Sequence, residues 1–189
     1  MRTRVGYTGG TTKDPTYHNL GDHSETIQID YDPAQVSYQE LLDVFWSSHF
    51  PAQQPWSRQY MSIVFYHNEE QKRLAMETRD REAAKLGAEI FTEIIPASEF
   101  YLAEPYHQKY RLRQVRDLME DLRRIYPDDG DFVASTAAAR VNGYLGGHGT
   151  LETLQAELDS LGLSPAASQK LLDIVAARTH GVHAPGGPK

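Results

Sequence analysis

Residues 21–33, GDHSETIQIDYDP, have the alternation of a β-strand but carry a carboxylate where an apolar side chain is expected. Apolar and polar residues alternate along the second half of the segment, as in a half-buried strand. Side chains two residues apart point to the same face, so the row that holds Ile27 and Ile29 also holds Glu25. The pattern therefore predicts a strand over residues 23–31 with Glu25 facing the core.

A carboxylate on the core side of a strand has to be paired, protonated or functional, because burial disfavours its charged form. Arg2 and Arg4, in the strand predicted just before it, are candidate partners for a salt bridge. The alternation leaves this salt bridge and a functional site open as alternatives.

The segments around this strand predict an α+β fold. They are a strand at 2–7, a helix that opens on the capping box of Ser37 and Glu40, a strand at 60–66, a helix from Asn68 to near Gly87, and a strand at 88–96. This order of strands and helices is typical of a two-layer mixed sheet with helices.

Beyond about residue 114 the periodicity is helical only. Helical patterns cover 117–126, 131–145, 150–162 and 164–178. We therefore predict a main domain over 1–113, a helical extension over 114–180 and a disordered tail over 181–189.

The charge and hydropathy of the chain exclude several classes of function. Its 19 basic and 26 acidic residues give a net charge of −7, which argues against a nucleic-acid partner. No run approaches the roughly 20 apolar residues that cross a bilayer. We expect a soluble, cytoplasmic protein with no membrane partner.

The absence of cysteine is the most restrictive feature of the composition. A chain without cysteine forms no disulfide and supplies neither a thiolate metal ligand nor a thiol nucleophile. The eight histidines are scattered without the spacing of a metal-ligand set, so no metal site is predicted.

Several motifs, taken in order and with their spacing, resemble the peptide methionine sulfoxide reductase A family. They are VGYTGG (5–10), PTYHNLGDHSETIQIDYDP (15–33), RQYMSIVFYHNEEQ (58–71) and EFYLAEPYHQKY (99–110). The resemblance covers about residues 3–113. VNGYLGG (141–147) and LGLSP (161–165) are similar to the C-terminal extension of some animal members.

The resemblance implies reduction of methionine-(S)-sulfoxide, free or in peptides, as a repair of oxidative damage. A thiolate attacks the sulfoxide sulfur, the oxygen takes up protons, and the resulting sulfenic acid is resolved by other thiols, with thioredoxin as reductant and no bound cofactor. By the same resemblance Glu25 is the proton donor, kept neutral by an apolar pocket. Tyr7 and Tyr60 would hydrogen-bond the sulfoxide oxygen, and His107 and Tyr110 would support substrate binding.

The chain also departs from the family pattern. The family's nucleophile is the cysteine of a Gly-Cys-Phe-Trp motif, whose Phe and Trp enclose the substrate methyl group. In the family this motif lies before the segment that corresponds to VGYTGG, and this sequence does not contain it. QQPWS (53–57) replaces a Gly-Asn-Asp segment of many relatives. We therefore expect a truncated isoform that is inactive alone. The alternatives are a catalytically dead module that binds sulfoxide peptides or dimerises, and a non-functional product.

Overall fold

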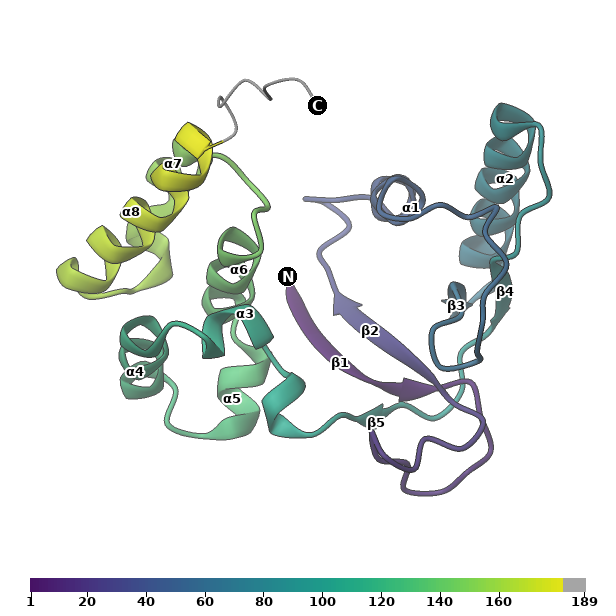
Figure 1. Ribbon diagram of the computed structural model, residues 1–189, viewed down its shortest axis with the longest axis horizontal. Coiled ribbons are helices and arrows are strands. Elements are labelled where there is room, and N and C mark those ends of the chain that lie inside the picture. Colours follow the sequence, from purple (N-terminus) through teal and green to yellow (C-terminus); the bar gives the residue numbers. More distant parts are fainter. Residues whose placement is uncertain (182–189) are drawn as a thin grey trace, which may run out of the picture. The chain divides into compact units, whose positions relative to one another are not determined.

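The computed structural model of the chain describes residues 1–181 (Figure 1). The chain forms two compact units, which we call the sheet unit (residues 5–104) and the helical unit (residues 1–4 together with the chain from Pro105 onward). The predicted division into a main domain over 1–113 and a helical extension over 114–180 stays a prediction. The predicted disordered tail lies almost entirely outside the described residues.

The strands form two small sheets. β1 (Arg2–Thr8), β2 (Ser24–Asp30) and β5 (Tyr101–Leu102) form a sheet in the order β2-β1-β5. β3 (Ile63–Tyr66) and β4 (Glu93–Pro96) pair in parallel, with Ile63 opposite Glu93. Antiparallel and parallel pairs combined with helices confirm the predicted mixed α+β fold.

The pairing of β1 with β5 depends on a glycine. The two strands are antiparallel, with Gly6 opposite Leu102 and Tyr7 opposite Tyr101. A Cβ atom at position 6 would lie 2.3 Å from the carbonyl oxygen of Tyr101, so a larger residue would force the strands apart. The glycine in VGY thus brings Tyr7 against the residues that follow β5.

Two helices with the predicted caps complete the sheet unit. α1 (Tyr38–Ser47) begins at the capping box of Ser37 and Glu40. α2 (Glu69–Leu86) begins where Asn68 accepts a bond from the Gln71 amide and ends at the left-handed Gly87. In each cap the two residues lie three positions apart, Ser37 with Glu40 and Asn68 with Gln71. Local sequence was therefore enough to place both helix starts.

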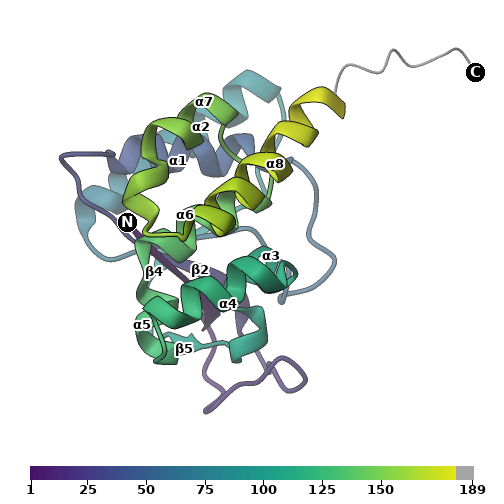
Figure 2. The same ribbon diagram turned by 90° about the vertical axis from the view of Figure 1, so that its left-hand side faces the viewer.

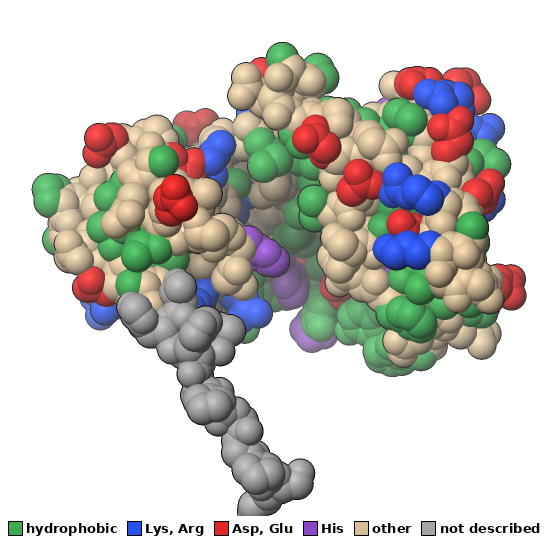
Figure 3. Space-filling view, turned by 90° about the horizontal axis from the view of Figure 1, so that it is seen from above, with side chains coloured by type: hydrophobic (Ala, Val, Ile, Leu, Met, Phe, Trp, Pro, Cys, Tyr) green, Lys and Arg blue, Asp and Glu red, His purple; other side chains and the backbone are tan. Residues whose placement is uncertain are grey.

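The helices α1 and α2 pack around a small core. Trp46 donates a buried 2.9 Å hydrogen bond from Nε1 to Oγ1 of Thr78 and packs in a cluster with Leu42, Val64 and Ala75. The outer face of α2 is charged, and side chains of both signs alternate over it in Figure 3. Arg73, for example, lies 2.6 Å from both Glu70 and Glu77. Such exposed pairs add little stability, so the buried face is what holds α2.

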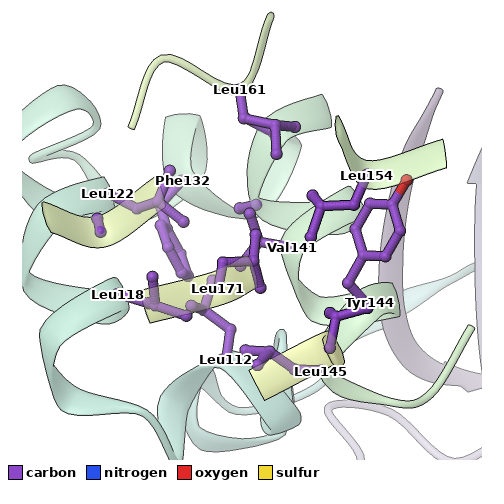
Figure 4. Close-up of a cluster of buried hydrophobic side chains, with 14 of the residues drawn as sticks. Leu112, Leu118, Leu122, Phe132, Val141, Tyr144, Leu145, Leu154, Leu161 and Leu171 are labelled. Atoms are coloured by element: carbon purple, nitrogen blue, oxygen red, sulfur yellow. The ribbon is translucent and has the colours of Figure 1, made fainter. Parts of the chain in front are cut away.

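The helical unit contains the largest core in the described part of the chain. Its elements, seen face-on in Figure 2, are η1 (Pro105–His107), α3 (Tyr110–Arg113), α4 (Arg116–Ile125), α5 (Asp129–Ala134), α6 (Thr136–Leu145), α7 (Leu151–Glu157), η2 (Leu158–Leu161) and α8 (Pro165–Gly181). Leu118, Phe132 and Leu171 are among its fully buried side chains (Figure 4). The predicted helical pattern over 131–145 is two helices, because Ser135 caps α6 by accepting a bond from the Ala138 amide.

Candidate functional site

The prediction that Glu25 faces the core is wrong. Glu25 is exposed, and Ile27 on the same face of β2 is 56% exposed. In the described part of the chain this face borders an open groove of about 330 Å³ between β2 and β3. The alternation identified the two faces of β2 correctly, but it could not show which of them is covered.

His23, the next residue back on the predicted inward row, is buried for a different reason. It lies in the turn before β2, where its Nδ1 accepts a 3.2 Å bond from the Gly10 amide and its Nε2 lies 2.8 Å from the Thr12 carbonyl oxygen. Asp22 accepts bonds from the amides of Thr11 and Thr12, and these bonds hold its pKa well below the usual range. Residues 22 and 23 therefore fasten the glycine-rich loop and position the start of β2.

The N-terminal end of β2 is tied to the segment that leads into β3. The Glu25 amide donates to the Gln59 carbonyl oxygen at 3.1 Å, and Oε1 of Glu25 accepts a 2.6 Å bond from Nε2 of Gln59. Oγ of Ser24 donates to the carbonyl oxygen of Arg58 at 2.6 Å. These bonds set Glu25 beside Tyr60, the residue that follows Gln59.

Beyond this contact the edges of β2 and β3 face the groove. The Glu25 amide points away from β1, so by the two-residue repeat the backbone groups of Ile27 and Ile29 do so too. The Ser62 carbonyl oxygen accepts a bond from the Glu93 amide in β4, and the Tyr66 carbonyl oxygen accepts one from the Ala97 amide just after β4. By the same two-residue repeat, the backbone groups of Ile63 point away from β4. Each sheet therefore presents a strand edge beside this apolar groove.

Tyr60 is held in its protonated form. A hydrogen bond with the Tyr17 side chain is the main cause that raises the pKa of Tyr60, and the negative charge of Glu25 adds to it. A hydrogen bond raises the pKa of the phenol that donates it, so the O–H of Tyr60 is directed to Tyr17, next to the Glu25 carboxyl group.

Tyr7 and Glu104 form the buried end of the same cluster. Tyr7 is 2% exposed, and its hydroxyl donates a 2.6 Å bond to Oε2 of Glu104. Oε1 of Glu104 accepts a 3.0 Å bond from the Tyr17 amide. Tyr17 and Glu104 thus link Tyr7 to Tyr60 and Glu25, so the sheet unit brings together three of the five predicted site residues.

His107 and Tyr110 belong to the helical unit. His107 ends η1, with its ring centroid 4.2 Å from that of Tyr106, and Tyr110 begins α3 with an exposed side chain. Their supporting role in substrate binding stays a prediction.

Sequence reasoning missed Tyr17 and Glu104 as members of the cluster. Both stand in motifs that carried the family resemblance, PTYHNL and YLAEP, but neither has a periodicity that marks it. What marks Glu104 is structural, because it lies two residues after the end of β5, in which Tyr101 pairs with Tyr7.

The cluster offers a carboxyl group and phenols, which can donate hydrogen bonds and protons to an oxygen atom. The chain contains no cysteine, so this site has no thiolate nucleophile of its own. Within residues 1–181 no three His, Asp or Glu side chains gather as a metal site would require. In the same residues no helix combines the length and apolar composition that crossing a membrane requires.

Two family models match the chain. The model described as peptide methionine sulfoxide reductase matches residues 1–130, and the one described as selenoprotein methionine sulfoxide reductase A, helical domain, matches residues 128–181. The two matches overlap over residues 128–130, at the start of α5 in the helical unit.

Known proteins of this family are similar to the chain. A peptide methionine sulfoxide reductase of Drosophila melanogaster is 44% identical over 171 residues, which cover 89% of this chain and 68% of that protein. A peptide methionine sulfoxide reductase MsrA of Methanosarcina acetivorans is 47% identical over 122 residues, 58% of this chain and 64% of that protein. The chain thus spans about two thirds of the length of these relatives.

A solved structure shares the fold. The crystal structure of Mxr1 from Saccharomyces cerevisiae in its reduced form matches with a TM-score of 0.56 and 28% identity, over 60% of this chain and 71% of that one. Together with the matched family models and the Drosophila relative, this similarity shows that the chain belongs to the peptide methionine sulfoxide reductase family.

Proposed function

We propose that the chain carries the proton-donating part of a methionine sulfoxide reductase site, and that alone it binds methionine sulfoxide without reducing it. The supporting observation is the cluster of Glu25, Tyr60, Tyr17, Tyr7 and Glu104 in a chain that has no cysteine. This cluster has the groups that an oxygen leaving sulfur needs, but not the group that attacks sulfur.

Glu25 and Tyr60 act directly on the sulfoxide oxygen in this proposal. The oxygen accepts a hydrogen bond from the Tyr60 phenol, whose single O–H first has to leave Tyr17. The Glu25 carboxyl group then supplies a proton as negative charge develops on that oxygen. Glu25 is exposed, so a bound sulfoxide can reach its carboxyl group.

Tyr7 is proposed to help in binding the oxygen, as the resemblance implies. Its single O–H donates to Glu104, so it serves the sulfoxide oxygen only if that proton leaves Glu104. His107 and Tyr110 are proposed to contact the rest of the substrate.

Reduction itself requires a thiol from outside this chain. A thiol takes the oxygen of methionine-(S)-sulfoxide, which leaves methionine and a sulfenic acid, and a second thiol converts the sulfenic acid to a disulfide and water. Loss of the nucleophile removes nearly all of an enzyme's rate, so the chain alone should not turn over. Thioredoxin as the final reductant and a cytoplasmic location are part of the same proposal.

Calorimetry with N-acetyl methionine sulfoxide and N-acetyl methionine tests the binding. The unmodified chain should prefer the sulfoxide, and Glu25→Gln and Tyr60→Phe should each reduce that preference by roughly tenfold, as expected for one hydrogen bond to a charged or strongly polarised group. Glu89→Gln removes an exposed carboxylate outside the cluster and should leave the preference unchanged.

A thioredoxin-linked assay on the same preparations tests turnover. Consumption of reductant should stay at background with the chain alone. Turnover with thioredoxin as the only other thiol protein present, or equal affinity for the sulfoxide and for methionine, would contradict the proposal.

A further inference from the structure

A second pocket lies beside Tyr60 and is not needed for the chemistry at the sulfoxide. It has a volume of about 210 Å³, and its walls include His49, Phe50, Trp56, Tyr60 and Thr92. This volume suits one side chain rather than a folded partner. Because Tyr60 belongs also to the Glu25 cluster, whatever enters this pocket lies next to the proposed sulfoxide site.

Trp56 gives the pocket an open aromatic wall. It is 80% exposed, and its ring lies nearly parallel to that of Tyr60, with centroids 4.9 Å apart and an interplanar angle of 27°. A tryptophan that exposes most of its surface leaves a large apolar face in water, which is unfavourable unless a ligand covers it. The stack fixes this face in the wall of the pocket.

His49 adds a hydrogen-bond acceptor whose orientation the structure determines. Nδ1 of His49 lies 2.8 Å from the Phe45 carbonyl oxygen, and a carbonyl oxygen only accepts, so Nδ1 carries the proton. In the neutral ring Nε2 then has a free lone pair. This atom is buried, and no described residue donates to it.

Thr92 provides a second polar atom in the same wall. The residue is 4% exposed, and its Oγ1 is also buried with no hydrogen-bond partner among the described residues. Buried polar atoms in folded proteins almost always have a partner, so two such atoms in residues that line one pocket point to a bound group. When the His49 ring is neutral, that group has to donate to its Nε2.

The absence of charged residues from the pocket lining limits which side chain can bind there. No Asp, Glu, Lys or Arg is among the residues that line it. A lysine or arginine side chain would be desolvated there without a counter-charge, which is costly. A primary carboxamide fits better, because its NH2 group can donate to Nε2 of His49, its oxygen can accept from Thr92, and its plane can lie on Trp56.

We infer that this pocket is a subsite for a glutamine or asparagine side chain next to the methionine sulfoxide in a peptide substrate. The inference rests on the proposed function, since it takes the sulfoxide to lie at Glu25 and Tyr60. Such a subsite would make the chain selective for the residue next to the methionine sulfoxide, and not only for the sulfoxide.

Peptide binding followed by tryptophan fluorescence tests the subsite. The chain has two tryptophans, and Trp46 is buried, so a ligand that covers Trp56 should shift the emission to shorter wavelength. The probes are the capped tripeptides Gln-Met(O)-Ala and Ala-Met(O)-Gln, the same pair with leucine in place of glutamine, and the methionine versions of all four. At least one glutamine peptide should bind roughly tenfold more tightly than its leucine counterpart, as expected for a pair of neutral hydrogen bonds.

Variants assign the preference to the pocket. Thr92→Val keeps the shape of the side chain and removes its hydroxyl, and Trp56→Ala removes the aromatic wall. Calorimetry replaces fluorescence for these variants, because Trp56→Ala removes the reporter. Each should abolish the preference for glutamine over leucine while the variant keeps its cooperative thermal transition. Val44→Ala, which trims another exposed apolar side chain outside the pocket, should leave the preference intact.

The outcomes separate the two proposals. Preference for sulfoxide over methionine without preference for glutamine overturns the subsite and leaves the proposed function standing. Preference for glutamine that is equal in the methionine and sulfoxide peptides supports the subsite and contradicts the proposed function. Preservation of the glutamine preference in Thr92→Val and Trp56→Ala overturns the subsite, because other residues would then be responsible.

Discussion

The hydroxyl of Tyr7 donates a 2.6 Å hydrogen bond to Oε2 of Glu104, a residue 97 positions away along the chain. This bond joins the buried side chain of β1 to the residue that follows the β5 region. The other carboxylate oxygen of Glu104 holds the amide of Tyr17. Glu104 therefore connects three segments at the base of the candidate site.

Tyr7→Phe should destabilise the sheet unit by about 1–3 kcal/mol, because it takes one donor from a partly buried carboxylate. Urea unfolding at pH 7 measures the loss. Tyr110→Phe removes the hydroxyl of an exposed tyrosine in the helical unit and should change stability by less than about 0.5 kcal/mol. Equal losses in the two variants would show that the bond to Glu104 contributes no net stability.

Tyr17→Phe should lower the pKa of Tyr60 toward the ordinary value of a tyrosine. The hydrogen bond with Tyr17 favours the protonated phenol, so its removal makes ionisation easier. Glu25→Gln should lower the same pKa by less, because the charge of Glu25 is the smaller cause. NMR titration of ring-labelled tyrosine reports both shifts.

Tyr38 serves as the internal control in that titration. Burial raises its pKa to about 12, and the charge that Tyr31 carries when ionised adds to the effect. Neither substitution touches those causes, so the pKa of Tyr38 should stay in place. A shift of Tyr38 together with Tyr60 would indicate a general change of structure rather than loss of one bond.

Ile27→Lys should reduce self-association of the chain without lowering its melting temperature. Ile27 is exposed on the edge strand β2 and faces an apolar groove, and a charge there opposes pairing with the edge of another molecule. Sedimentation velocity over a range of concentrations measures the effect. Val44→Lys places the same charge on an exposed helix position, and if it lowered association equally, the strand edge would not be the cause.

Lys109 should make the free energy of unfolding rise with pH between about pH 8 and pH 10.5. Burial, with the positive charge of Arg4, lowers the pKa of Lys109 to about 8 from its ordinary value of about 10.5, while its ammonium group donates to Thr3. Between these two values the unfolded chain binds more protons than the folded chain does, so deprotonation favours folding. The contribution is absent below pH 8 and rises by at most about 1.4 kcal/mol per pH unit up to about pH 10.5.

Urea unfolding at pH 7.5, 9 and 10 measures this contribution as a difference between variants. Lys109→Met should lose the rise that Lys109 contributes. Lys170→Met, which removes an exposed lysine on α8, should keep it. Parallel pH curves for all three proteins would rule out a lowered pKa at Lys109.

The sequence alone determined the features that depend on near neighbours. The start of α1 at Ser37 and the start of α2 at Asn68 both follow from side chains that bond to an amide three residues on. The absence of cysteine excludes a thiol nucleophile whatever the fold. The ordered motifs indicated the family, because they preserve both residue type and spacing.

Only the tertiary structure decided which predicted site residues come together and how exposed each one is. Alternation placed Glu25 and Ile27 on one face, but the exposure of that face depends on what packs against it, and in the described residues it borders an open groove. The pairing of Tyr7 with Glu104 and the meeting of His49 with Thr92 in one pocket join residues far apart in the sequence. Local propensity contains no information about such contacts, because they form only when separate strands and loops pack together.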